Sequence, residues 1–179
     1  MKAAMEYSRV SNYLLPDAIT DLAQRVVTQN ADAGRKVVTA ESCTGGLVSG
    51  AITEIAGSSA VLDRAFVTYS NEAKMEALGV ASDIIETFGA VSIACVWAMA
   101  QGALERSNAD VAVAISGVAG PGGGTQLKPV GTVVFARAFR NQTGEPEGEL
   151  KLFDGGDGED ARAIIRHQAT ICALELLLP

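Results

Sequence analysis

Three side chains that could act as nucleophiles stand in a row within the stretch TAESCTGGL, namely Ser42, Cys43 and Thr44. Gly45 and Gly46 follow them, and the next segment, LVSGAITEI, has apolar residues at helical spacing. Taken by itself, the stretch favours a helix start in which Ser42 or Thr44 is the N-cap and the glycines permit a tight turn. The alternative is that Ser42 attacks a carbonyl group while backbone N–H groups of the turn stabilise the resulting oxyanion.

A serine nucleophile needs a neighbouring base to take its proton. The only histidine of the chain, His167, lies within the pattern of the last helix, where we expect a solvated side chain, so a Ser-His-Asp triad is not predicted. A lysine, a tyrosine or a carboxylate remains as the base. Lys74 lies one turn into a helix predicted after TYSN, where a lysine is ordinarily a surface residue. As a base it would need a pKa lowered by burial or by a neighbouring cation.

Two further features leave alternatives open. Cys43 competes with Ser42 as a nucleophile, but strand alternation directs its thiol back towards the core. The glycine cluster in SGVAGPGGGTQLKP is neither a Walker A motif nor a GxGxxG between a strand and a helix. It is either a flexible surface loop or, between Ser116 and Lys128, a backbone nest for a phosphate or carboxylate group.

The elements that must position these residues alternate between helix and strand. This alternation predicts an α/β domain with helices on both faces of a mixed sheet, whose last two strands form an antiparallel pair. In such sheets ligands bind beyond the carboxyl ends of the strands, where ESCTGG, TYSNEAK and the glycine cluster all fall. The expected helices cover 16–34, 47–57, 71–79, 81–88, 92–107 and 160–177, and the expected strands cover 36–40, 64–70, 110–116, 130–138 and 148–153.

Composition narrows the class of protein. With 179 residues, the chain has room for one domain, in which we expect residues 1–14 to be a loosely held extension. A net charge of −7 argues against nucleic acid as a partner, although a small phosphorylated ligand needs only a few donors. No apolar run reaches the roughly 18 residues of a membrane span, and no secretory signal is recognisable. Three scattered cysteines favour reduced thiols, so we expect a cytoplasmic protein without a membrane partner.

Five blocks of the sequence, spread from about residue 15 to the end, resemble the CinA C-terminal domain family, also called the nicotinamide-nucleotide amidase family. They are TAESCTGGLVSGAIT, FVTYSNEAKMEALGV, GAVS…MAQGAL, ADVAVAISGVAGPGGGTQLKPVGTVVFA and ARAIIR. The resemblance implies a three-layer α/β/α sandwich over a mixed, mostly parallel sheet of about five or six strands. It also implies hydrolysis of the carboxamide of nicotinamide mononucleotide to the nicotinate nucleotide and ammonia, with no metal or organic cofactor. Longer CinA proteins carry a further N-terminal domain, and we expect the stand-alone form here.

Carried over residue by residue, the resemblance makes Ser42 the nucleophile and Lys74 its activating partner, with Tyr69 lining the site. Ser116 stands where the family has threonine, and the family's short turn before the last helix is longer here, so Arg162 is placed by its four-residue spacing to Arg166. The residues that the resemblance assigns to substrate binding are Thr44, Gly45, Gly46, Ser116, Gly120, Gly122, Gly123, Thr125, Lys128 and Arg162.

Two other functions fit the same residues. The domain could be a nucleotide-binding or regulatory module that keeps the pocket without turnover, or it could act on a different amide or pyrophosphate. Apolar helix faces also favour a homo-oligomer, for which we expect a dimer.

Overall fold

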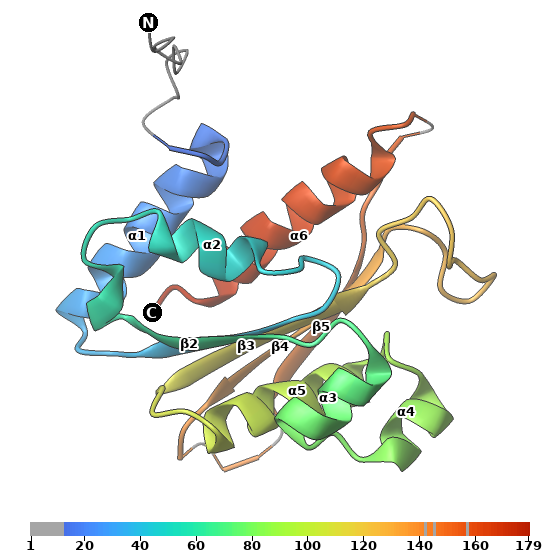
Figure 1. The fold of residues 1–179 in the computed structure, drawn as a ribbon, viewed down its shortest axis with the longest axis horizontal. Helices are drawn as coiled ribbons and strands as arrows, with labels where there is room; N and C mark the ends of the chain where they lie inside the picture. The colour runs from blue at the N-terminus through green and yellow to red at the C-terminus, as the bar shows by residue number, and fades with distance from the viewer. Residues whose placement is uncertain (1–12, 142, 145, 157) are drawn as a thin grey trace, which may run out of the picture.

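A computed structural model of the chain describes residues 13–141, 143–144, 146–156 and 158–179. Five strands form one sheet in the order β2-β1-β3-β4-β5. The strands are β1 (Val37–Glu41), β2 (Leu62–Val67), β3 (Val111–Gly117), β4 (Thr132–Phe139) and β5 (Glu147–Leu152). Figure 1 shows this twisted sheet between two layers of helices, so the predicted α/β/α sandwich is confirmed.

The sheet is mixed, as expected. β1 pairs in parallel with both β2 and β3, whereas β4 is antiparallel to β3 and to β5. Four of the five strands therefore run in one direction, and only β4 runs against them. The carboxyl ends of β1, β2 and β3 consequently lie together at one edge of the sheet, where the chain then turns into Ser42, Thr68 and Val118.

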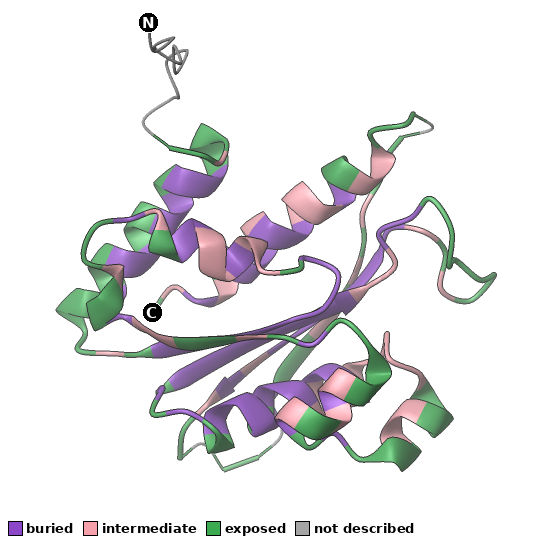
Figure 2. Ribbon diagram, in the orientation of Figure 1, coloured by how far each residue is buried: buried purple, intermediate pink, exposed green. Residues whose placement is uncertain are grey.

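Each face of the sheet packs against its own helices (Figures 1 and 2). Residues of α1, α2 and α6 form one buried cluster with alternate strand residues such as Val37 and Ile115, and α3 and α5 form the other with Val38 and Ala114. The helices are α1 (Asp17–Asp32), α2 (Leu47–Thr53), α3 (Asn71–Leu78), α4 (Ser82–Phe88), α5 (Ile93–Glu105) and α6 (Ala161–Leu176), with a short 3-10 helix at Ser58–Ala60.

Local sequence accounts for the start and the end of α3, the helix that carries Lys74. The Ser70 hydroxyl accepts a hydrogen bond from the Ala73 N–H at 3.0 Å, which caps the first turn. Gly79 ends the helix with a φ of 70°, a left-handed conformation that glycine adopts without a steric penalty. The two signals fix the helix to the segment NEAKMEAL, as the sequence predicts.

The clearest differences from the predicted boundaries are at the ends of β2 and α2. β2 ends at Val67 and not at Ser70, so residues 68–70 form a loop whose carbonyl groups are free to contact side chains. Helix α2 ends at Thr53, two residues before the last apolar residue of its pattern. Most of the expected N-terminal extension, residues 1–14, lies outside the described residues. Across the described part of the chain, none of the helices combines the length and the apolar character needed to span a membrane.

Candidate active site

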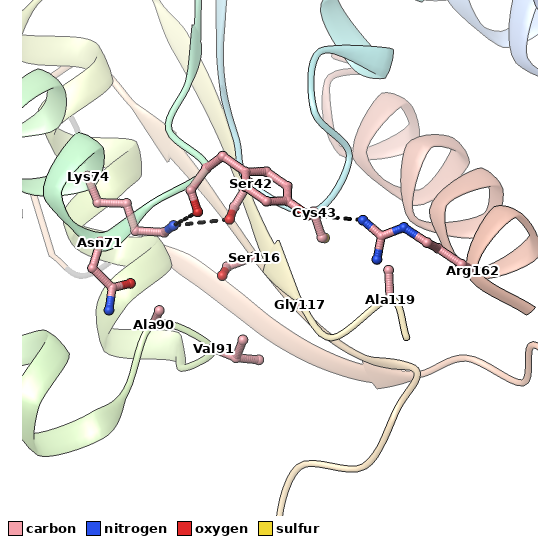
Figure 3. Close-up of a pocket in the computed structure, with 11 residues that line it drawn as sticks. Ser42, Cys43, Asn71, Lys74, Ala90, Val91, Ser116, Gly117, Ala119 and Arg162 are labelled. Atoms are coloured by element: carbon pink, nitrogen blue, oxygen red, sulfur yellow. Dashed lines mark hydrogen bonds between the residues drawn. The ribbon is translucent and has the colours of Figure 1, made fainter. Parts of the chain in front are cut away.

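A pocket of about 230 Å³ opens beyond the carboxyl ends of β1 and β3. In Figure 3, Lys74 and Asn71 of α3 approach it from one side and Arg162 of α6 from the other, with Ser42 and Ser116 between them. Five segments that are separate in the sequence therefore meet at this edge of the sheet. The lining residues are Ser42, Cys43, Tyr69, Asn71, Lys74, Ala90, Val91, Ser116, Gly117, Ala119 and Arg162.

Ser42 and Lys74 are in direct contact in this pocket. The Lys74 Nζ lies 3.0 Å from the Ser42 Oγ, although 32 residues separate the two in the chain. The Nζ also donates to the carbonyl oxygens of Thr68 at 2.9 Å and Tyr69 at 3.3 Å. A neutral amine has two hydrogens and one lone pair, so it can donate to these carbonyl groups while its lone pair accepts the Ser42 O–H. The geometry suits transfer of the Ser42 proton to Lys74.

Burial changes the acid–base behaviour of Lys74. Its side chain is 1% exposed, and no carboxylate lies within ion-pair distance of it in the described residues. Desolvation lowers the pKa of the Lys74 ammonium below its ordinary value, and the Cys95 and Cys43 thiols and the Glu72 carboxyl oppose this only in part. The neutral, proton-accepting form is therefore more populated at neutral pH than in a surface lysine.

Cys43 lines the pocket next to Ser42 but is poorly suited to be the nucleophile. It is 5% exposed, and desolvation raises the pKa of its thiol to about 11. The reactive form of cysteine is the thiolate, which is scarce at neutral pH when the pKa is this high. The structure thus favours Ser42 over Cys43 as the nucleophile. Ser42 contacts Lys74, whereas the Cys43 thiol is scarcely ionised at neutral pH.

The turn after Ser42 is built around two glycines. Gly45 and Gly46 adopt φ angles of 61° and 96°, so glycine is needed for the tight turn. Their N–H groups, however, are already bonded: Gly45 donates to the Ser42 carbonyl at 3.1 Å and Gly46 to the Glu41 carboxylate at 2.9 Å. Thr44 is fully buried, and none of the three lines the pocket. The N–H groups of Gly45 and Gly46 are therefore already used within the turn, and the assignment of Thr44, Gly45 and Gly46 to substrate binding stays a prediction.

Two arginines of α6 take different positions one helical turn apart. Arg162 lines the pocket, and its guanidinium donates to the Tyr69 hydroxyl at 3.0 Å and to the Gly120 carbonyl at 2.7 Å. Arg166 instead donates to the Cys43 and Thr44 carbonyls. Arg162 is thus the arginine that the structure brings to the pocket, together with Tyr69.

Only the start of the stretch SGVAGPGGGTQLKP, residues 116–119, contributes to the pocket wall, through Ser116, Gly117 and Ala119. Gly120 contacts the site through its carbonyl, which accepts from Arg162, and Ser116 lines the pocket at the end of β3. The Lys128 Nζ donates to the Phe88 carbonyl at 2.7 Å, so it points towards the end of α4. Of the loop residues expected to bind substrate, Gly120, Gly122, Gly123, Thr125 and Lys128 all lie outside the set that lines the pocket.

Several residues of the site are not identified by the sequence analysis. Asn71, Ala90, Val91, Gly117 and Ala119 line the pocket, and only Asn71, as a polar residue after a strand, carries a signal that sequence could have supplied. His167, as expected, is absent from this pocket. It lines a separate apolar groove of about 440 Å³ between α1 and α6, together with Leu15 and Ile164.

Comparison with known proteins places this geometry in a family. The model of the CinA C-terminal domain matches residues 19–179. A protein of Escherichia coli K12 named nicotinamide-nucleotide amidohydrolase PncC is 48% identical over 159 residues, which cover 89% of this chain and 92% of its own length. A CinA-like protein of Akkermansia muciniphila is 52% identical over 141 residues, but this match spans only 34% of that longer protein. The crystal structure of the competence/damage inducible protein CihA from Agrobacterium tumefaciens has a TM-score of 0.85 at 49% identity, covering 92% of this chain and 96% of that one.

Proposed function

Because the chain belongs to the CinA C-terminal domain family, we propose that it hydrolyses the carboxamide of nicotinamide mononucleotide to nicotinate mononucleotide and ammonia. The observation that carries this proposal is the pairing of Ser42 with Lys74, a buried lysine of lowered pKa that lies 3.0 Å from the hydroxyl oxygen. The name of the E. coli relative, which matches over nearly its whole length, supports the choice of substrate.

In the first half of the reaction, neutral Lys74 takes the Ser42 proton while the Oγ attacks the carboxamide carbon. The tetrahedral intermediate carries an oxyanion and collapses when its C–N bond breaks. Lys74 returns the proton to the departing nitrogen, so that ammonia leaves and a Ser42 ester remains.

In the second half, a water molecule attacks the Ser42 ester. Lys74 takes a proton from this water, the ester C–O bond breaks, and the proton returns to the Ser42 Oγ. Nicotinate mononucleotide leaves with its carboxyl group, and both residues regain their starting protonation. These steps involve only groups of the protein and water, so full activity is expected after treatment with a chelator.

The Arg162 side of the pocket would bind the phosphate of the nucleotide. Its guanidinium is held by the Tyr69 hydroxyl and the Gly120 carbonyl, which leaves a fixed cation opposite Lys74. Arginine recognises phosphate through paired N–H donors, and binding energy gained there can orient the carboxamide towards Ser42. Lys128 is a weaker candidate because its ammonium group is turned to the Phe88 carbonyl.

Ammonia release from nicotinamide mononucleotide by the purified protein tests this function. We expect turnover of the mononucleotide and much slower turnover of the riboside that lacks the phosphate. Binding of the mononucleotide without ammonia release would identify the chain as a nucleotide-binding module. Faster ammonia release from another amide would show that this other amide is the substrate.

We also propose that the protein forms a homodimer in the cytoplasm. Phe88, Leu150 and Leu152 are each more than half exposed, which is apolar surface that a second copy could cover. Light scattering should then give twice the chain mass of 18.5 kDa.

A further inference from the structure

The turn between β1 and α2 is held on one side by a buried carboxylate. Glu41, the residue before the nucleophile candidate, is 0% exposed and accepts hydrogen bonds from three backbone N–H groups. These belong to Gly46 at 2.9 Å, Val48 at 3.1 Å and Ser49 at 2.9 Å. They are N–H groups at the start of α2, which lack partners within the helix. The side chain of Glu41 thereby ties α2 to the end of β1, and Ser42 lies between the two attachment points.

A guanidinium holds the same turn on its other side. The Arg166 Nε donates to the Cys43 carbonyl at 3.1 Å, and its Nη2 donates to the Thr44 carbonyl at 3.0 Å. Arg166 follows Arg162 by four residues, so both side chains leave the same face of α6. One helix therefore contacts both the pocket and the backbone of the nucleophile turn.

The Glu41 attachment occupies the Gly46 N–H, and the Arg166 attachment holds the carbonyl of the peptide between Cys43 and Thr44. The Cys43–Thr44 peptide is trans, so its N–H points away from the carbonyl that Arg166 holds. Within the described part of the chain, neither the Cys43 N–H nor the Thr44 N–H donates to an oxygen atom. Hydrogen bonds from both N–H groups lower the pKa of the Cys43 thiol and so oppose the effect of its burial, and sulfur is a weak acceptor. These two N–H groups are the backbone donors nearest to the Ser42 hydroxyl along the chain that are not bonded to an oxygen atom.

We propose that Glu41 and Arg166 are positioning residues, which orient the nucleophile turn so that the N–H group of Cys43, a residue that lines the pocket, receives the oxyanion. This inference rests on the proposed acyl transfer to Ser42 and deepens it. The Cys43 N–H takes the place of the Gly45 and Gly46 N–H groups as the oxyanion donor, because those two groups are bonded within the turn. Neither positioning residue lines the pocket, so their loss should reduce the rate of the chemical step and leave substrate binding almost unchanged.

Two variants and one matched control test the inference. Arg166→Gln removes the paired donors, and Glu41→Gln places an amide NH₂ group against N–H groups that need an acceptor. Arg140→Gln is the control, because Arg140 also donates to backbone carbonyl groups, those of Leu104, Ser107 and Ala109, at a distance from the pocket. For each folded variant, kcat and KM for ammonia release are measured, together with the rate at which phenylmethylsulfonyl fluoride labels Ser42 and the melting temperature.

We expect Arg166→Gln and Glu41→Gln to lower kcat and the labelling rate about a hundredfold, with KM within about threefold of the wild type. Arg140→Gln should lower the melting temperature without changing either rate. If Arg166→Gln does not fold, Arg166→Lys is judged by the same criteria. Rates in the Arg166 variant equal to those of the Arg140 control would overturn the inference.

The labelling measurement separates this inference from the proposed substrate. A wild-type protein that is labelled at Ser42, but releases no ammonia from nicotinamide mononucleotide, would refute the substrate. The inference would still be supported if labelling slowed in Arg166→Gln. A wild-type protein that is neither labelled nor active would refute the nucleophile and the inference with it.

Discussion

Replacement of Lys74 by arginine should abolish the proposed amidase activity while keeping a positive charge beside Ser42. The Lys74 Nζ lies 3.0 Å from the Ser42 Oγ, and the other contacts of this Nζ are carbonyl oxygens, which cannot take a proton from serine at neutral pH. Arginine stays protonated throughout the accessible pH range, so it can donate a hydrogen bond but cannot act as the base. Loss of a general base costs about 10²- to 10⁴-fold in rate, or roughly 3–5 kcal/mol of transition-state stabilisation.

The assay is the initial rate of ammonia release from nicotinamide mononucleotide, measured as a function of pH. Because burial lowers the pKa of Lys74, kcat/KM of the wild type should rise with pH and level off below the ordinary pKa of lysine. Lys74→Met, which has no ammonium group, should lose as much activity as Lys74→Arg. A Lys74→Arg enzyme with more than about a tenth of the wild-type kcat would refute the assignment of Lys74 as the base.

The same lowered pKa has a consequence for folding. The unfolded chain keeps the Lys74 proton up to the ordinary pKa of 10.5, whereas the folded protein releases it at a lower pH. Between these two pKa values the unfolded state binds more protons, so this residue increases the stability as the pH rises through that window. This gain in stability is lost again as the pH falls through the pKa that Lys74 has in the folded protein. Unfolding by urea at a series of pH values should show this rise in the wild type and not in Lys74→Met.

Three other substitutions have defined outcomes. Cys43→Ala should keep kcat within about threefold of the wild type, because a thiol with a raised pKa contributes little thiolate, and a large loss would reopen its role as a nucleophile. Arg162→Gln should raise KM by about tenfold or more through loss of a charged donor, and an unchanged KM would remove Arg162 from phosphate binding. Gly102→Ala should destabilise the fold by about 1–3 kcal/mol, because the added Cβ would lie 1.9 Å from the Leu78 carbonyl oxygen where α5 packs on α3. Wild-type stability of that variant in urea unfolding would show that the two helices can move apart.

The sequence predicts the fold well where a local signal and a packing requirement agree. The β3 segment reads as a near-continuous apolar run, and six of its seven residues are buried between the two helical layers. The bounds of α3 follow from its cap and its terminal glycine. The approach of Lys74 to Ser42 is predicted from the rule that strand ends meet at one edge of a parallel sheet and from the family resemblance, which makes Lys74 the activating partner of Ser42.

The parts of the site that the sequence does not predict depend on long-range orientation. Glu41 reads as an ordinary polar residue after a strand, and nothing local shows that its carboxylate turns back to the start of α2. The rotation of α6, which directs Arg162 to the pocket and Arg166 to the turn, is set by packing against the core. The glycine loop contains many possible donors, but its path past α4 depends on contacts such as that of Lys128 with the Phe88 carbonyl.

The measurement that tests the central claim most directly is the single-turnover rate of ammonia release from nicotinamide mononucleotide by Ser42→Ala, compared with the wild type. Removing this hydroxyl leaves Lys74 and Arg162 in place, so substrate binding should persist while the chemical step is lost. We predict a decrease of at least about a thousandfold, because a nucleophile and its base act as a unit. A Ser42→Ala protein that releases ammonia within about tenfold of the wild-type rate would contradict the account.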